Sequence, residues 1–282
     1  MLESYISFSE YRLFESCQYK HFLSKVLKFQ EPKNEFLIFG SSLHSAIEDI
    51  ILKKTNKIAW GKVFEQKLKE ESNDILMKSY FGRQFSYQGT AILKELNFFE
   101  RFKDYEVVGV ELEMYEPLQK DEVITLYFKG IIDLVLKKGD RYLILDWKSA
   151  NTLWDLKKKF NLHETSKNVF EFREDPKDKS FFGQLALYKH FYSQKFNIPL
   201  DKIDTAFIAL SRDPVNCQRY DIEISKAFQS FIVNDVTRVA REILLLDPNN
   251  LKKVKFEDKS ACQYCFFKKD KSICDNEKKQ VI

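Results

Sequence analysis

Two apolar, β-branched runs on either side of a tight-turn dipeptide constrain this chain most. The segment GIIDLVLKKGDRYLILDWKS, residues 130–149, places Gly139-Asp140 between them, which is typical of a hairpin with a two-residue turn. Such a turn pairs residues symmetrically about itself, so we expect Asp133 to face Asp146 directly. Cross-strand neighbours have Cβ atoms about 4.5–5.5 Å apart, and two like charges at that spacing repel each other.

This acidic pair needs a compensating partner, because the aliphatic flanks of both aspartates predict burial. An uncompensated buried carboxylate is costly, so a proton, a basic side chain or a divalent cation should accompany the pair. Hard oxygen ligands of this kind suit Mg²⁺ or Mn²⁺. Lys148 lies on the same strand face as Asp146, about 6.6 Å along the strand. Its ammonium could hold an attacking water or stabilise negative charge on a phosphorane, or it could only neutralise the two acids.

The hydrophobic patterns predict a mixed α/β domain with a central sheet, an N-terminal helical region and a cysteine-bearing tail. Ser41 is the expected N-cap of the second helix, Gly82 and Gly89 are expected to interrupt the third, and 149–180 reads as a long polar connection. We expect helices at about 5–30, 40–54, 60–104, 181–196 and 225–246, and strands at about 107–115, 123–138, 141–149 and 203–211.

Five cysteines in a chain without a secretion signal make a disulfide framework unexpected. Cys262 and Cys265 form a CxxC, the spacing at which two thiolates can bind one metal, and Cys274 follows. Cys17 could supply a fourth ligand if the two ends of the chain meet. We interpret Cys217 as a small buried packing residue.

The composition fits a globular protein, with 44% hydrophobic residues and a net charge of +4. No apolar run is long enough to span a membrane, so we expect a cytoplasmic protein from a bacterium, an archaeon or a phage. Lysines cluster at 157–159, 252–255 and 268–271, interleaved with aromatic residues, which is compatible with a path for single-stranded nucleic acid. The interleaved aromatic residues are Trp154, Phe160, Phe256, Phe266 and Phe267.

The hairpin resembles the D-x(n)-(D/E)-x-K core of the PD-(D/E)XK nucleases, in particular their RecB-like branch. Further segments agree in order with that branch: ISFSEYRLFESCQYKHF, FGSSLHSAIED and, after the hairpin, QLALY. The cysteines at the two ends resemble the iron-sulfur subgroup, which includes AddB-type helicase-nucleases and CRISPR-associated adaptation nucleases. The resemblance spans about residues 5–275 and implies a restriction-endonuclease-like mixed sheet flanked by helices.

The resemblance also implies roles for individual residues. His44, Asp133 and Asp146 would bind the catalytic metal, and Lys148 would be the catalytic lysine. Gln184 and Tyr188 match a Q-x-x-x-Y helix, and their i,i+4 spacing places them on one helix face, although Tyr188 could equally be core. Glu111 falls where some relatives have an additional acid, and Glu113 is the alternative because it shares the same strand face.

Cys17, Cys262, Cys265 and Cys274 match a split pattern that resembles a 4Fe-4S site, with structural zinc as the alternative. Gln18 replaces the usual proline after the first cysteine. These features together predict one nuclease domain over residues 1–282. It would comprise a helical part (1–104) with Cys17 and His44, a catalytic sheet (105–215) with the insert 149–180, and a C-terminal helix and cluster tail (216–282).

The predicted activity is metal-dependent hydrolysis of DNA, as an exonuclease on DNA ends or single strands in recombination, repair or DNA processing. Two other interpretations stay open: a DNA-binding module whose nuclease site has decayed, and an accessory subunit that depends on a helicase, recombinase or integrase partner. The complete His44, Asp133, Asp146 and Lys148 set argues against the first. No GxxxxGK[ST] phosphate-binding loop is present, which excludes a fused motor of that type but not a separate one.

Overall fold

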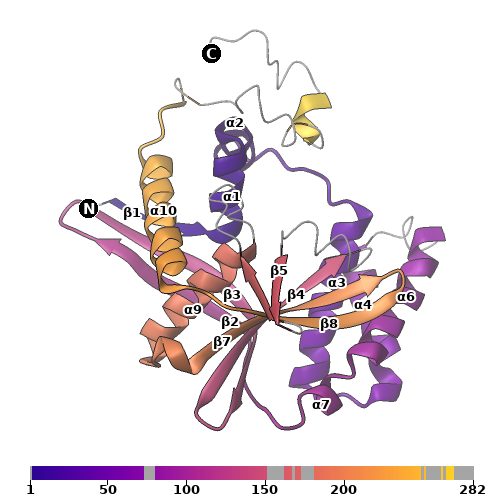
Figure 1. The fold of residues 1–282 in the computed structure, drawn as a ribbon. Coiled ribbons are helices and arrows are strands. Elements are labelled where there is room, and N and C mark those ends of the chain that lie inside the picture. The colour runs from indigo at the N-terminus through magenta and orange to yellow at the C-terminus, as the bar shows by residue number, and fades with distance from the viewer. Residues whose placement is uncertain are drawn as a thin grey trace. The chain divides into compact units, whose positions relative to one another are not determined.

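The structure is a computed structural model that describes residues 2–72, 80–150, 162–166, 169–172, 181–248, 251, 262 and 265–269. The chain divides into two compact units (Figure 1). Unit 1 comprises Met1–Pro32, Tyr115–Gly130 and Ser230–Ile282, and unit 2 comprises Lys33–Met114 and Ile131–Gln229. Whether they act as one nuclease domain over 1–282 stays a prediction.

Unit 2 contains a mixed central sheet, as the sequence predicts. β4 and β7 run parallel, as do β6 and β8, while the pairs β3–β4, β7–β8 and β5–β6 are antiparallel. β2 (Glu106–Lys120) pairs with β3. From β3 onward, the strand order is β3 (Ile124–Lys138), β4 (Arg141–Ala150), β7 (Ile203–Arg212), β8 (Val215–Ile222), β6 (Val169–Phe172) and β5 (Leu162–Ser166).

Helices cover both faces of this sheet. On one face, α3 (Glu35–Leu52), α4 (Trp60–Glu71) and α6 (Tyr80–Leu96) pack together and against Leu145 and Trp147 of β4 in one hydrophobic core. Successive strand residues point to opposite faces, so Asp146 and Lys148 point the other way, toward α9 (Phe181–Phe196). Because helices cover both faces of the sheet, the central strand β7 is almost completely buried. The short helix α7 (Phe98–Arg101) and the 3-10 turns η2 (Lys57–Ala59) and η3 (Leu200–Lys202) connect these elements.

Two predicted helix boundaries are wrong. α3 begins at Glu35 with Asn34 as its N-cap, so Ser41 lies inside the helix. Asn34 accepts a hydrogen bond from the Leu37 amide at 2.9 Å, so this residue, and not Ser41, provides the cap. α6 continues through both of its glycines. At Gly89 a side chain would not fit, because its Cβ would lie 2.1 Å from the Phe64 ring of α4.

Strands were underpredicted where the sequence lacks clear alternation. β1 (Leu2–Ser7) replaces the start of the first expected helix, and β8 occupies the polar stretch around Cys217. Cys217 is buried, as predicted. The insert 149–180 contains the hairpin β5–β6, and its other residues beyond Ala150 lie outside the described part of the chain. The remaining predicted strands and the helices α9 and α10 (Lys226–Leu244) are confirmed.

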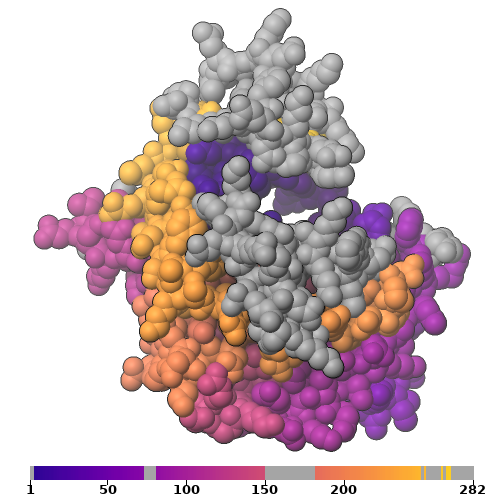
Figure 2. Space-filling view, viewed as in Figure 1, coloured from indigo at the N-terminus to yellow at the C-terminus, as the bar shows by residue number. Residues whose placement is uncertain are grey.

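In unit 1, β1 runs parallel to the first half of β3, and α1 (Phe8–Ser16) follows it directly. The four-residue α2 (Gln18–His21) and the π-helix η1 (Phe22–Val26) continue the chain, and η5 (Phe266–Lys269) lies near its other end. α10 presents one side to the surface, as Figure 2 shows, and buries Ile232, Val236 and Val239 on the other. No helix in the described residues is long and apolar enough to cross a membrane.

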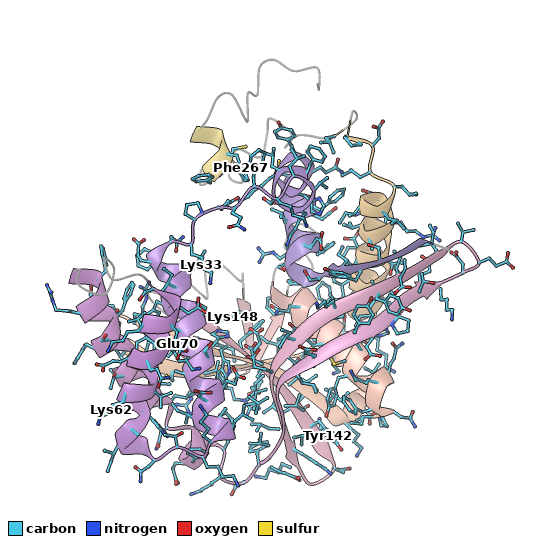
Figure 3. The ribbon with its side chains drawn as sticks, turned by 180° about the vertical axis from the view of Figure 1, so that it is seen from behind. Lys33, Lys62, Glu70, Tyr142, Lys148 and Phe267 are labelled. Carbon is cyan, nitrogen blue, oxygen red and sulfur yellow. The ribbon has the colours of Figure 1, made fainter. Side chains whose placement is uncertain are left out.

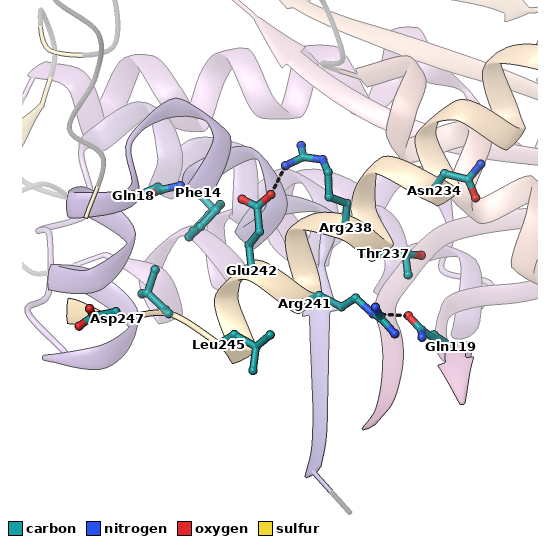
Figure 4. A pocket seen from close by; sticks show the side chains of 11 residues that line it. Phe14, Gln18, Gln119, Asn234, Thr237, Arg238, Arg241, Glu242, Leu245 and Asp247 are labelled. Carbon is teal, nitrogen blue, oxygen red and sulfur yellow. Dashed lines mark hydrogen bonds and ion pairs between the residues drawn. The ribbon is translucent and has the colours of Figure 1, made fainter. Parts of the chain in front are cut away.

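Unit 1 also has a cavity of about 780 Å³ between α1, α2, the end of β2 and α10 (Figure 4). Its arginines are already bound by neighbouring side chains. Arg238 pairs with Glu242 at 2.5 Å, and Arg241 donates to Gln119 at 2.7 Å. None of the predicted catalytic side chains lines this cavity.

Candidate active site

The central hairpin forms with the predicted register. Leu134 pairs with Leu145, and the pairing continues to Lys138 and Arg141 around Gly139-Asp140. Gly139 has φ of 62°, as the first position of a type II′ turn requires. Asp133 and Asp146 occupy the next facing position beyond Leu134 and Leu145, so the turn alone brings the two carboxylates to the same place on the sheet.

Asp133 is held by the neighbouring strand. Its Oδ2 accepts a hydrogen bond of 2.8 Å from the backbone N–H of Trp147, and its side chain is only 12% exposed. Burial raises the pKa of Asp133 to about 6, although the positive charge of Lys148 and the Trp147 hydrogen bond oppose this rise. The folded chain therefore holds a carboxylate that it does not fully stabilise.

Asp146 and Lys148 form a buried ion pair between the ammonium and Oδ2 of the carboxylate. Burial also raises the pKa of Asp146 to about 6, with Lys148 lowering it and Asp133 raising it further. Lys148 (labelled in Figure 3) additionally donates to Gln184 Oε1 at 3.1 Å. One ammonium thus bridges a strand carboxylate and a helix amide, which fixes its position above the sheet.

Gln184 and Tyr188 continue this chain of contacts on α9. Gln184 donates from Nε2 to the Tyr188 hydroxyl at 2.9 Å, as their i,i+4 spacing predicts. Burial raises the pKa of Tyr188, so its hydroxyl stays protonated at neutral pH. Tyr188 is 4% exposed, so it packs in the core while its hydroxyl contacts Gln184, and a functional role for it stays a prediction.

His44 reaches the same site from α3. Its Nδ1 lies 3.5 Å from Asp133 Oδ2. Burial lowers the pKa of His44 to about 4, so the imidazole is neutral near pH 7 and keeps a ring nitrogen lone pair for a metal. The three side chains that the resemblance assigns to a metal, His44, Asp133 and Asp146, thus come together from α3, β3 and β4.

Glu111 of β2 belongs to this acidic group, whereas Glu113 is exposed. Burial raises the pKa of Glu111 to about 7, and the charges of Asp133, Glu48 and Asp146 raise it further. Glu111 has φ of 47°, a left-handed value that non-glycine residues rarely adopt. That Glu111 rather than Glu113 is the additional acid stays a prediction.

Glu48 was missed by the sequence analysis. It follows His44 by four residues on α3, and its charge acts on Glu111. The sequence does contain a signal for Glu48, because an acid four residues after His44 lies on the same face of the helix.

The donors of this site fit a hard divalent cation by their chemistry, since two carboxylates with raised pKa values and a neutral imidazole face one another. As placed, however, no three His, Cys, Asp or Glu side chains of the described residues form a group that could hold a metal ion. The metal-binding roles assigned to these residues therefore stay predictions.

The cysteines lie in unit 1 as far as they are described. Cys17 joins α1 to α2, and its Sγ accepts a hydrogen bond of 3.3 Å from the Lys20 amide. Phe267 contacts Phe29, with ring centroids 6.4 Å apart, so the segment after Cys265 meets the segment after Cys17. Cys274 lies outside the described residues.

The expected path of lysines and aromatic residues is only partly described. Phe267 is buried and cannot stack on a base, whereas Phe266 is exposed. The side chains of the three lysine clusters, and of Trp154, Phe160 and Phe256, lie outside the described residues.

A family model of the PD-(D/E)XK nuclease superfamily matches residues 5–275. The chain belongs to this superfamily. Its mixed sheet flanked by helices is the restriction-endonuclease-like fold that the sequence predicts. Members of the superfamily typically use Mg²⁺ or Mn²⁺, and membership supports nuclease activity. No curated protein matches the chain.

Among solved structures, the chain is similar to a candidate exonuclease from Eubacterium rectale, with 11% identity and a TM-score of 0.57. That match covers 93% of this chain and 88% of the other, and at this identity it shows the fold alone. A protein designated SSO0001 matches with 13% identity and a TM-score of 0.35, over 93% of this chain and 95% of the other.

Proposed function

We propose that this chain is a metal-dependent deoxyribonuclease, an exonuclease that acts on DNA ends or single strands in recombination, repair or DNA processing. The observation that carries the proposal is the bridge made by Lys148 between Asp146 and Gln184, beside Asp133 and His44. A lysine that only neutralised acids would not need the Gln184 amide. Here the amide and Tyr188 hold the ammonium in one orientation, as expected of a group that contacts a reacting atom.

In this mechanism, Lys148 would hold the attacking water or stabilise charge on the phosphate as the phosphodiester bond breaks. Gln184 orients Lys148, and Tyr188 orients Gln184. His44, Asp133 and Asp146 would hold the divalent cation, with Glu111 as a possible fourth donor. The cation would supply Lewis-acid stabilisation of the phosphate.

The test is degradation of end-labelled linear DNA and of circular DNA with Mn²⁺ by the parent protein, Lys148→Ala and Asp146→Ala. Lys202→Ala is the matched control, because Lys202 pairs with Asp140 at the far end of the hairpin. We expect both site variants to lose activity, Lys202→Ala to keep it, and circular DNA to survive. Equal degradation by all four proteins excludes this active site, and cleavage of circular DNA excludes a strict exonuclease.

We further propose that Cys17, Cys262, Cys265 and Cys274 bind a 4Fe-4S cluster, as in the iron-sulfur subgroup of the RecB-like branch. The support is the contact between the segments that carry Cys17 and Cys265, together with the N–H···S bond at Cys17, a common feature of cluster thiolates. Purification without oxygen should give a brown protein, and Cys262→Ala should lose its iron while Cys217→Ala keeps it. A colourless parent that contains zinc shows instead that the site is a zinc site.

A further inference from the structure

The strands of unit 1 carry a row of tyrosine side chains on one face. Tyr5 of β1 and Tyr127 of β3 are register partners in the parallel pair that these strands form. Tyr115 of β2 stacks on Tyr127, with ring centroids 4.6 Å apart and an interplanar angle of 18°, and its centroid lies 6.4 Å from that of Tyr5. The Lys129 ammonium lies 5.3 Å from the Tyr5 ring centroid. We call Tyr5, Tyr115, Tyr127 and Lys129 the tyrosine face.

The tyrosine face is open to solvent, whereas the opposite side of the same strands is core. Successive strand residues point to opposite sides, and Ile6 of β1 and Leu126 and Phe128 of β3 are buried. Tyr5 and Tyr115 are instead 51% and 47% exposed. Two large rings that contact each other at the surface are held in place and remain accessible to a ligand.

The charged side chains of β1 and β3 on this side lie at opposite ends of the row. In the register of the two strands, Glu3 pairs with Thr125 and Ser7 pairs with Lys129. An offset of four residues corresponds to about 13 Å along a strand. The charge of Glu3 acts on Tyr115, but Lys129 is exposed and forms no ion pair within the part of the chain that the structure describes. Lys129 is therefore a cation at one end of the row that an anionic group can reach.

The surroundings of the rings do not resemble the centre of a protein interface. Such a centre is apolar and depleted of charged residues. The side chains that flank the tyrosines on β1 and β3 are polar or charged instead: Glu3, Ser7, Thr125 and Lys129. Rings that are set among polar groups suit a ligand with flat aromatic surfaces and its own charge.

Single-stranded DNA has both of these features. Its unpaired bases present π faces that stack on aromatic side chains, and its phosphates pair with lysine. A double helix hides the faces of its bases between neighbouring base pairs, so it can use only the lysine. β3 also carries Asp133, four residues after Lys129, so the strand that supplies a proposed metal ligand supplies part of this face as well.

We propose that the tyrosine face is an accessory binding site for single-stranded DNA, with bases stacked on Tyr5 and Tyr115 and a phosphate on Lys129. This inference rests on the proposed nuclease function, because it assigns a second contact to the same class of substrate. Tyr127 supports the Tyr115 ring from its stacked side. Stacking does not identify the base, so the site accepts any sequence. One lysine adds one phosphate contact, so stacking supplies most of the affinity.

The first experiment measures binding of a fluorescent single-stranded 30-mer by anisotropy in metal-free buffer, where the DNA stays intact. Tyr5→Ala and Tyr115→Ala should each weaken binding about tenfold, as expected for a lost stacking ring. Tyr5→Phe and Tyr115→Phe keep the ring and should bind like the parent. Tyr87→Ala is the matched control, because Tyr87 of α6 is 74% exposed and belongs to unit 2. Binding of a duplex of the same length should not change in any tyrosine variant.

Salt dependence separates the phosphate contact from the stacking contacts. Each phosphate contact of a single strand adds about 0.7 to the slope of log affinity against log salt concentration. Lys129→Ala should therefore reduce this slope by about 0.7. Tyr5→Ala should lower the affinity at every salt concentration and leave the slope unchanged. Lys62→Ala, at an exposed position of α4, is the matched control and should alter neither quantity.

Several results would overturn the inference. One is an affinity of Tyr5→Ala and Tyr115→Ala equal to that of the parent or of Tyr87→Ala. Another is an equal loss in the phenylalanine variants, which assigns the effect to the hydroxyl groups and not to stacking. A third is unchanged DNA binding with a changed oligomeric state in light scattering, which shows that the face joins two copies of the chain. Unchanged thermal unfolding excludes misfolding as the cause of a loss, and Lys129→Ala tests the face even if an alanine variant of a tyrosine does not fold.

Failure of this inference can be distinguished from failure of the proposed function. If cleavage depends on Lys148 but Tyr5→Ala and Tyr115→Ala bind single-stranded DNA as tightly as the parent, the tyrosine face alone is refuted. If the parent cleaves no DNA with Mn²⁺ while the tyrosine effects on binding remain, the nuclease proposal is refuted and the face is a DNA-binding site only.

Discussion

Replacing Asp133 with asparagine should stabilise the metal-free protein while it removes activity. The asparagine keeps an oxygen that can accept the Trp147 N–H hydrogen bond of 2.8 Å, so the hairpin geometry is preserved. The charge is lost, and with it the cost of a buried carboxylate beside Asp146. A pKa that rises from 3.8 to about 6 means that the folded chain disfavours the ionised form by about 3 kcal/mol.

The stability difference between Asp133→Asn and the parent should depend on pH. Because the pKa of Asp133 is higher in the folded than in the unfolded chain, its ionisation costs no stability below about pH 4, where both states are protonated. The cost appears as the pH rises from about 4 to 6 and is complete at pH 8. Asp133→Asn should therefore match the parent near pH 4 and exceed it by up to about 3 kcal/mol at pH 8.

The assay is thermal unfolding in metal-free buffer at several pH values, where 3 kcal/mol corresponds to roughly 5–10 °C in Tm. Adding Mn²⁺ should raise the Tm of the parent but not of the variant. Asp140→Asn is the matched control: Lys202 lowers the pKa of this exposed turn residue, so its replacement should give no stabilisation. An Asp133→Asn protein that is less stable than the parent at pH 8, or a difference independent of pH, would refute the reasoning.

Three further predictions concern packing, positioning and metal binding. Gly89→Ala should destabilise the protein by about 1–3 kcal/mol in thermal or denaturant unfolding, because its Cβ would overlap the Phe64 ring; an unchanged Tm contradicts the close approach of α4 and α6. Gln184→Ala should lower kcat about tenfold with little change in KM, since it releases Lys148, and Tyr188→Phe should have a smaller effect. Mn²⁺ binding measured by calorimetry in two buffers should release protons at pH 6 but hardly any at pH 8.5, because Glu111 and the two aspartates have raised pKa values; equal proton release at both contradicts this.

The sequence by itself determined the features that depend on short-range geometry. A two-residue turn at Gly139 sets the register of two strands, so the facing of Asp133 and Asp146 follows from counting residues. Strand alternation likewise places Lys148 beside Asp146, and helical periodicity places Gln184 beside Tyr188. These relations hold within one hairpin or one helix, whatever the rest of the chain does.

Only the tertiary structure decided which distant elements join this hairpin. Gly89 lies inside α6, where it makes room for the Phe64 ring of α4, whereas its sequence signal suggested a break. Glu48 of α3 and Glu111 of β2 join the site because folding brings elements far apart in the sequence together, so that the charges of Glu48 and Asp133 act on Glu111. Such contacts depend on packing between elements far apart in the sequence, and local propensity carries no information about them.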